Sequence, residues 1–73
     1  MEKTYKIKNL ECAHCALKME RALGKISGVE NVSINFMTQK LLIEAEEDKF
    51  SDIIEMARKA VSKIEKQAEI VQN

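Results

Sequence analysis

The hydrophobic pattern of this chain switches repeatedly between a period of two and a helical period, and this limits the folds open to it. From Thr4 to Lys8 apolar and polar side chains alternate, which predicts a short strand. From Cys12 to Ile26 the apolar residues instead recur at helical spacing. We expect Gly28 to end this helix, because glycine readily adopts the left-handed conformation that helix C-termini favour.

The remainder of the chain predicts two further strands, a second helix and a last strand. Alternating segments at 32–36 and 41–45 flank a turn at 37–39, which predicts a hairpin whose turn lacks glycine. After a polar break at 46–49, the pattern predicts a helix from Phe50 to Ile64, with Asp48 or Ser51 as its N-cap. A last alternating segment begins at Ala68 and predicts a fourth strand that runs to Asn73.

The order strand, helix, strand, strand, helix, strand predicts an α+β fold. Its sheet would have four antiparallel strands, with both helices covering one face. A chain of 73 residues is expected to form a single domain spanning 1–73. At this size only about 60% of the unfolded surface can be buried, so the core must be one thin layer.

The composition excludes several classes of function. Twelve basic residues balance twelve acidic ones, which gives no electrostatic reason to expect binding to nucleic acid or to an anionic membrane. No apolar run approaches the roughly 20 residues of a membrane span, and the N-terminal "MEKTYKIK" does not resemble a signal peptide. We therefore expect a soluble, cytoplasmic protein without membrane insertion, whose thiols are kept reduced.

The chemistry of the chain is concentrated in the segment "ECAHC". Both cysteines, Cys12 and Cys15, lie there with the only histidine, His14, between them and Glu11 directly in front. Cys12 is expected in the loop after the first strand, and Cys15 in the first turn of the helix. Both sulfur atoms can then approach the free N–H groups at the helix start, where the helix dipole favours thiolates. Such a pair is either a metal site or a redox pair.

The surrounding residues favour metal over redox chemistry. In a thiol–disulfide oxidoreductase, a carboxylate such as Glu11 beside the first cysteine would raise the pKa of the nucleophile, and the chain has no proline to face the pair. A zinc ribbon needs a second pair of ligands, and haem attachment needs a histidine where Ala16 stands. Two structural cysteines would not be expected in a polar loop. The remaining interpretation is an open dithiolate site for copper(I), zinc or cadmium, whose vacant positions let a partner take the ion.

The segment "LECAHCALKMERALGKISGVENVSINF" resembles the heavy-metal-associated domain family, whose usual motif is G-M-x-C-x-x-C followed by a helix and G-V-x-x-v-x-v-n. The family includes copper chaperones, mercury-binding proteins and N-terminal domains of heavy-metal P-type ATPases. The resemblance implies a ferredoxin-like βαββαβ sandwich, metal binding by Cys12 and Cys15, and handover to a similar domain or a transporter. Asn9 and Leu10 stand where glycine and methionine are usual. That methionine normally packs under the loop, so its loss affects loop geometry more than ligation.

Glu11 bears on the choice of metal. Copper(I) is satisfied by two thiolates, whereas divalent zinc, cadmium or lead needs three or four ligands and tolerates oxygen. We therefore predict Glu11 as a third ligand, and the alternative is a solvated loop carboxylate. An acidic residue at this position, like the segment "NFMTQKLLIEAE", resembles the zinc and cadmium branch of the ATPases. The "C-x-H-C" order also resembles some bacterial copper chaperones.

Other residues are expected near the site. Glu65, in the loop before the last strand, offers a further carboxylate, although a glutamate at a helix end is more often only a solvated charge. His14, Leu10 and Lys66 are expected beside the metal or at a partner contact. Met19 and Met56 occupy apolar helix positions, so core packing explains them better than a thioether site does.

These observations predict a non-catalytic domain that binds Zn²⁺ or Cd²⁺, or else Pb²⁺, through Cys12, Cys15 and Glu11. The resemblance suggests the cytosolic N-terminal domain of a metal-exporting P-type ATPase. Its partners would be other domains of that ATPase or another C-x-x-C domain, with a mostly monomeric chain that metal could bridge into dimers. The alternatives are a free-standing copper(I) chaperone, a thiol–disulfide oxidoreductase and an interaction module that binds no metal.

Overall fold

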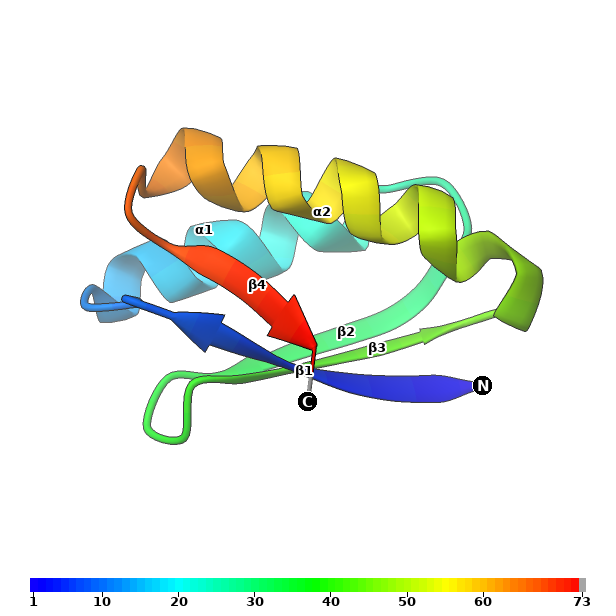
Figure 1. Cartoon of the computed structure of the whole chain (residues 1–73), viewed down its shortest axis with the longest axis horizontal. Coiled ribbons are helices and arrows are strands. Elements are labelled where there is room, and N and C mark those ends of the chain that lie inside the picture. The colour runs from blue at the N-terminus through cyan, green and yellow to red at the C-terminus, as the bar shows by residue number, and fades with distance from the viewer. Residues whose placement is uncertain (73) are drawn as a thin grey trace.

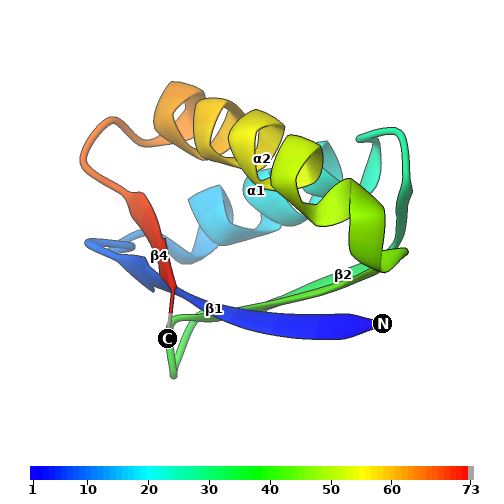
Figure 2. The same cartoon turned by 45° about the vertical axis from the view of Figure 1, so that its right-hand side comes forward.

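The computed structural model describes residues 1–72 and shows a four-stranded sheet with two helices on one face (Figures 1 and 2). In chain order the elements are β1 (Glu2–Lys8), α1 (Ala13–Gly24), β2 (Val29–Asn35), β3 (Lys40–Ala45), a 3₁₀ turn η1 (Glu47–Lys49), α2 (Phe50–Ile64) and β4 (Glu69–Gln72). The strand order is β2-β3-β1-β4, and every neighbouring pair is antiparallel. The predicted fold class is confirmed.

The core lies between the sheet and the helix layer. Side chains at alternate positions of β1 and β3 face the helices, and one stripe of each helix faces the sheet. Its central members are Ile7, Leu41, Ile43, Met19, Leu23, Ile53 and Val61, each with at most 1% of its surface exposed. Burial of an aliphatic side chain of this size contributes about 1.5–3 kcal/mol. The two periods in the sequence therefore correspond to two surfaces that pack against each other.

The first helix ends earlier than predicted. α1 stops at Gly24, and the N–H of Lys25 already bonds to Ala22 O at 3.2 Å. Gly28 does adopt a left-handed conformation, with φ of 98°, but it serves the turn into β2 rather than the helix end. β2 begins directly after it at Val29, and the pairing register with β3 shifts between Val29 and Asn31.

The hairpin between β2 and β3 turns without glycine, as predicted. Asn35 Oδ1 accepts hydrogen bonds from the N–H groups of Met37 and Thr38, at 3.0 and 3.2 Å. Gln39 adopts a positive φ of 55°. The asparagine side chain and the left-handed glutamine thus supply what glycine would otherwise supply.

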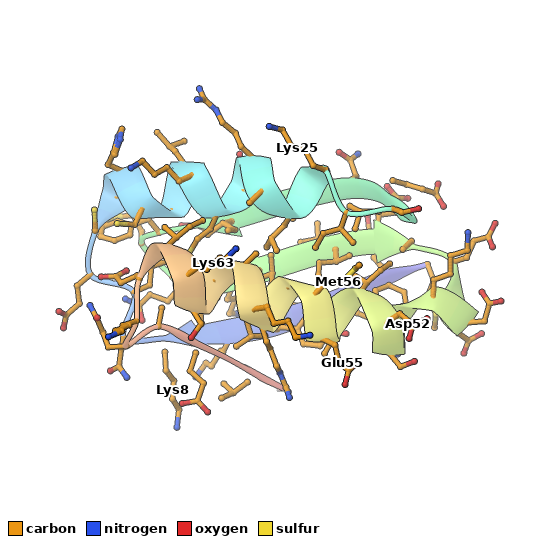
Figure 3. The ribbon with its side chains drawn as sticks, turned by 90° about the horizontal axis from the view of Figure 1, so that it is seen from above. Lys8, Lys25, Asp52, Glu55, Met56 and Lys63 are labelled. Atoms are coloured by element: carbon orange, nitrogen blue, oxygen red, sulfur yellow. The ribbon has the colours of Figure 1, made fainter. Side chains whose placement is uncertain are left out.

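Two predictions about α2 are wrong, although its bounds are as expected. Neither Asp48 nor Ser51 is its N-cap: the N-cap is Lys49, whose side chain makes no capping hydrogen bond within residues 1–72. The preceding turn η1 has already brought the backbone into a helical conformation, so the chain enters α2 without a capping side chain. Met56 is 52% exposed and lies on the outer surface of the helix layer, whereas Met19 is buried (Figure 3). Core packing therefore accounts for Met19 only.

The fourth strand begins one residue later than predicted, at Glu69. Its expected end at Asn73 lies outside the described residues. Across residues 1–72, the helices are too short or too polar to span a bilayer.

Gly28→Ala should lower the free energy of unfolding by about 1–2 kcal/mol, because alanine would have to adopt a left-handed backbone. Its methyl carbon would also lie 3.1 Å from Lys49 Cδ. Gly24→Ala is the matched control, since Gly24 is helical and the nearest atom, Val32 Cγ1, would be at an ordinary 3.5 Å. Alanine is favoured over glycine in helices by about 0.5–1 kcal/mol. Urea unfolding measures both changes, and equal stabilities of the two variants would contradict this account of the turn.

Candidate metal centre

Cys12 and Cys15 meet at the start of α1. Cys12 is the N-cap residue, with an extended backbone, and its Sγ accepts a hydrogen bond from the Cys15 N–H at 3.2 Å. Its carbonyl accepts from the Ala16 N–H at 3.0 Å. The sulfur therefore occupies the place of the oxygen that usually caps a helix. Both thiols are free and half-buried, and Cys15 also packs against the core.

The two thiols differ in how readily they lose a proton. Hydrogen bonds from the Cys15 side chain and then from the Cys15 N–H lower the pKa of Cys12. The same side-chain contact, together with desolvation, raises the pKa of Cys15. The pair is thus arranged to carry its first negative charge on Cys12, which is the form that attacks electrophiles and binds soft metals.

Glu65 is the acidic residue whose charge acts on both sulfur atoms. It follows α2 as its C-cap, and its negative charge offsets a small part of the lowering of the Cys12 pKa and adds to the rise of the Cys15 pKa. Its Oε2 accepts a hydrogen bond from Gln67 Nε2 at 2.7 Å. Its Oε1 is buried and has no hydrogen-bond partner within residues 1–72. Such an oxygen is unfavourable in the metal-free protein and is a ready donor atom for a cation.

The other predicted residues lie around this pair. Glu11, in the loop between β1 and α1, has an exposed side chain, as do His14 and Lys66. Within residues 1–72 no three Cys, His, Asp or Glu side chains are already grouped closely enough to hold an ion. The sulfur pair is therefore formed in the folded chain, whereas any further ligand must come from a side-chain movement or from a partner.

The loop before Cys12 fits the two departures from the family motif. Asn9 has a positive φ of 61°, which asparagine tolerates better than most residues other than glycine. Leu10 is fully buried and fills the space beneath the loop. Asn9 thus adopts the positive φ for which the family motif has glycine, and Leu10 provides the buried side chain for which it has methionine.

Three residues that hold this loop are not evident from the sequence. Gln39, at the hairpin turn, donates its side-chain N–H to Leu10 O, and its own carbonyl accepts from the Ile7 N–H at 2.9 Å. Asn9 Nδ2 donates to Gln67 O at 3.2 Å. The β1–α1 loop therefore lies beside both the hairpin turn and the α2–β4 loop, at one end of the molecule (Figure 1). The only signal for Asn9 is its place where the family motif has glycine.

Comparison with known proteins identifies relatives named as zinc, cadmium and lead transporters and relatives named as copper chaperones. The model of the heavy-metal-associated domain matches residues 4–69. The chain is 33% identical over 57 residues to a zinc/cadmium/lead-transporting P-type ATPase of Shigella sonnei, covering 78% of this chain and 8% of that protein. It is 32% identical over 47 residues to the copper chaperone CopZ of Enterococcus hirae, covering 64% of this chain and 68% of the chaperone.

Solved structures share the fold. The N-terminal domain of ZntA in its apo form is 28% identical, with a TM-score of 0.73, over 99% of this chain and 90% of that one. The chain spans less than a tenth of the length of the ATPases that it matches.

Cys12 should react with iodoacetamide before Cys15 near neutral pH. The pKa of Cys12 is lowered and that of Cys15 raised, so more Cys12 is thiolate below the ordinary thiol pKa. The larger thiolate fraction outweighs the modest loss of nucleophilicity that accompanies a lower pKa. Substoichiometric labelling followed by peptide mass spectrometry gives the ratio of the two adducts. The ratio of Cys12 to Cys15 adducts should fall as the pH rises above both pKa values, because both thiols are then ionised and Cys15 is the more basic nucleophile. Equal labelling at neutral pH would contradict the assignment.

Proposed function

The chain belongs to the heavy-metal-associated domain family, and from this premise we propose that it binds one Zn²⁺ or Cd²⁺ ion and passes it on by ligand exchange. Pb²⁺ has the same requirement for several soft and oxygen ligands. The proposed ligands are the thiolates of Cys12 and Cys15 and one carboxylate. The observation that carries the proposal is the carboxylate of Glu65, which acts on both thiols and has a buried, unpaired oxygen.

The preference for a divalent ion follows from charge and coordination number. Two thiolates neutralise a divalent ion but leave at least one coordination position open, and an oxygen ligand can fill it. A copper(I) ion with two thiolates gains little from a carboxylate, and Glu65 adds a further negative charge beside an already anionic complex. The carboxylate is thus useful to the first ion and unfavourable or neutral for the second.

Ligand exchange is favoured by how little of the ion the chain can enclose. The two sulfur atoms lie half-buried at one end of the molecule, on a helix start and the loop before it. Thiolates from another C-x-x-C domain can enter the vacant positions before either cysteine leaves. The free energy then changes little at each step, which is what transfer between similar sites requires.

We place the domain at the cytosolic N-terminus of a metal-exporting P-type ATPase, as the identity to the Shigella sonnei transporter suggests. The module itself would bind the ion, while other domains of the same protein would hydrolyse ATP and move the ion. The second candidate is a free-standing copper(I) chaperone, because the match to CopZ extends over 68% of that small protein. A reading frame that continues beyond Asn73 into hydrophobic spans with a C-P-C motif supports the transporter, and a stop codon there supports the chaperone.

Glu65→Gln should lower the affinity for Cd²⁺ roughly tenfold, which is about 1.4 kcal/mol, while leaving the affinity for copper(I) unchanged. The substitution keeps the size of the side chain and removes its charge. Glu11→Gln is the matched variant for the carboxylate beside Cys12, and competition with a chromophoric chelator measures both affinities. A selective Cd²⁺ loss in Glu11→Gln alone would assign the third ligand to Glu11. Equal effects on the two metals, or none in either variant, would remove the third-ligand proposal.

A further inference from the structure

Gln67 links the loop before Cys12 to Glu65 through two hydrogen bonds. Its carbonyl accepts the hydrogen bond from Asn9 Nδ2 at 3.2 Å, and its side-chain N–H donates to Glu65 Oε2 at 2.7 Å. Asn9 and Gln67 are 58 residues apart in the chain. One residue thus connects the β1–α1 loop through its backbone and the proposed carboxylate ligand through its side chain.

The main chains of Asn9 and Glu65, the two residues that Gln67 connects, are both fixed by the fold. Asn9 has a φ of 61°, and the residue after it, Leu10, is fully buried in the core. Glu65 donates its N–H to Val61 O at 2.9 Å, and its carbonyl accepts from the Ala68 N–H at 3.0 Å. The Glu65 main chain is therefore fixed, and the rotation of its side chain is what the hydrogen bond from Gln67 restricts.

The hydrogen bond also determines which oxygen of Glu65 is left for a ligand. Oε2 is occupied by the Gln67 amide, whereas Oε1 is buried and without a partner among the described residues. The charge of the same carboxylate reaches both Cys12 and Cys15. A cation bound to the two sulfur atoms would supply the partner that Oε1 lacks once the Glu65 side chain moves onto it, because the described residues do not yet group three ligands.

We propose that Asn9 and Gln67 are positioning residues that hold the Glu65 carboxylate toward the sulfur pair and thereby make the site selective for divalent ions. The inference rests on the proposed role of Glu65 as a ligand. A carboxylate whose rotation is already restricted by the Gln67 hydrogen bond loses less conformational entropy when it moves onto the ion as a third ligand. We call the hydrogen bonds from Asn9 to Gln67 and from Gln67 to Glu65 the clamp. Only an ion that uses a third ligand benefits from it, so the clamp raises the affinity for Zn²⁺ and Cd²⁺ and leaves the affinity for copper(I) unchanged.

Gln67→Ala should lower Cd²⁺ affinity roughly tenfold, as is common when a group that orients a metal ligand is removed. Copper(I) affinity and the urea-unfolding midpoint of the metal-free domain should not change. The matched control is Ser62→Ala, an exposed position in the last turn of α2. The ¹¹³Cd chemical shift gives a second measurement, because Gln67→Ala should move it toward the value of the Glu65→Gln variant, in which the oxygen ligand is absent.

A double-mutant cycle separates positioning from general support of the loop. In the Glu65→Gln background, Gln67→Ala should cause no further loss of Cd²⁺ affinity, since it acts only through the carboxylate. Asn9→Gly keeps the left-handed backbone and removes the side-chain hydrogen bond, so it should give a smaller loss in the same direction.

Every other outcome contradicts either the clamp or the third-ligand proposal. If Gln67→Ala weakens Cd²⁺ and copper(I) binding equally, or adds its full effect to Glu65→Gln, the residue supports the loop and the selectivity inference fails. If Glu65→Gln weakens Cd²⁺ binding and Gln67→Ala does not, the clamp fails and the proposed function stands. If Glu65→Gln itself has no effect, the clamp fails, and the Glu11→Gln variant decides whether the third-ligand proposal stands with Glu11 or fails as well.

Discussion

The hydrogen bond from the Cys15 N–H to the Cys12 sulfur, at 3.2 Å, is the contact on which the site depends. It satisfies one of the N–H groups that every helix start leaves free, and so it defines where α1 begins. It also brings the two sulfur atoms to one side of the helix end. Because it stabilises negative charge on Cys12, the interaction that starts the helix also favours the thiolate form of the first proposed metal ligand.

Patterns that depend on neighbouring residues could be predicted from the sequence. The period of the apolar residues gave the bounds of α2 and the order of all six main elements, and the two-residue spacing gave the places of Cys12 and Cys15 relative to α1. Where the chain departs from prediction, contacts from elsewhere decide. The turn η1 leads into α2 without a capping side chain, and Gly28 packs beneath Lys49 and Ile53. Met56 has the residue type of a core position but lies on the outer side of its helix.

The same distinction separates the two candidate carboxylates. Glu11 is next to Cys12 in the sequence, and this adjacency is all that a reading of the chain can use. Glu65 is 50 positions after Cys15, and its charge acts on the thiols only because α2 ends near the start of α1 in the helix layer (Figure 2). Gln39 and Gln67 support the loop through hydrogen bonds that join residues 29 and 58 apart. No local pattern encodes such contacts.

An unpaired, buried carboxylate oxygen is a local cost that a small fold has little stability to offset. A glutamine at position 65 would remove a negative charge that opposes ionisation of both thiols, and each thiol of the metal-free protein would bind its proton slightly less tightly. In the proposed function a cation would lie between the carboxylate and the two sulfur atoms, and it would then offset the repulsion among all three. In the proposed function, therefore, the feature that is least favourable in the empty domain is the one that gives a divalent ion its advantage.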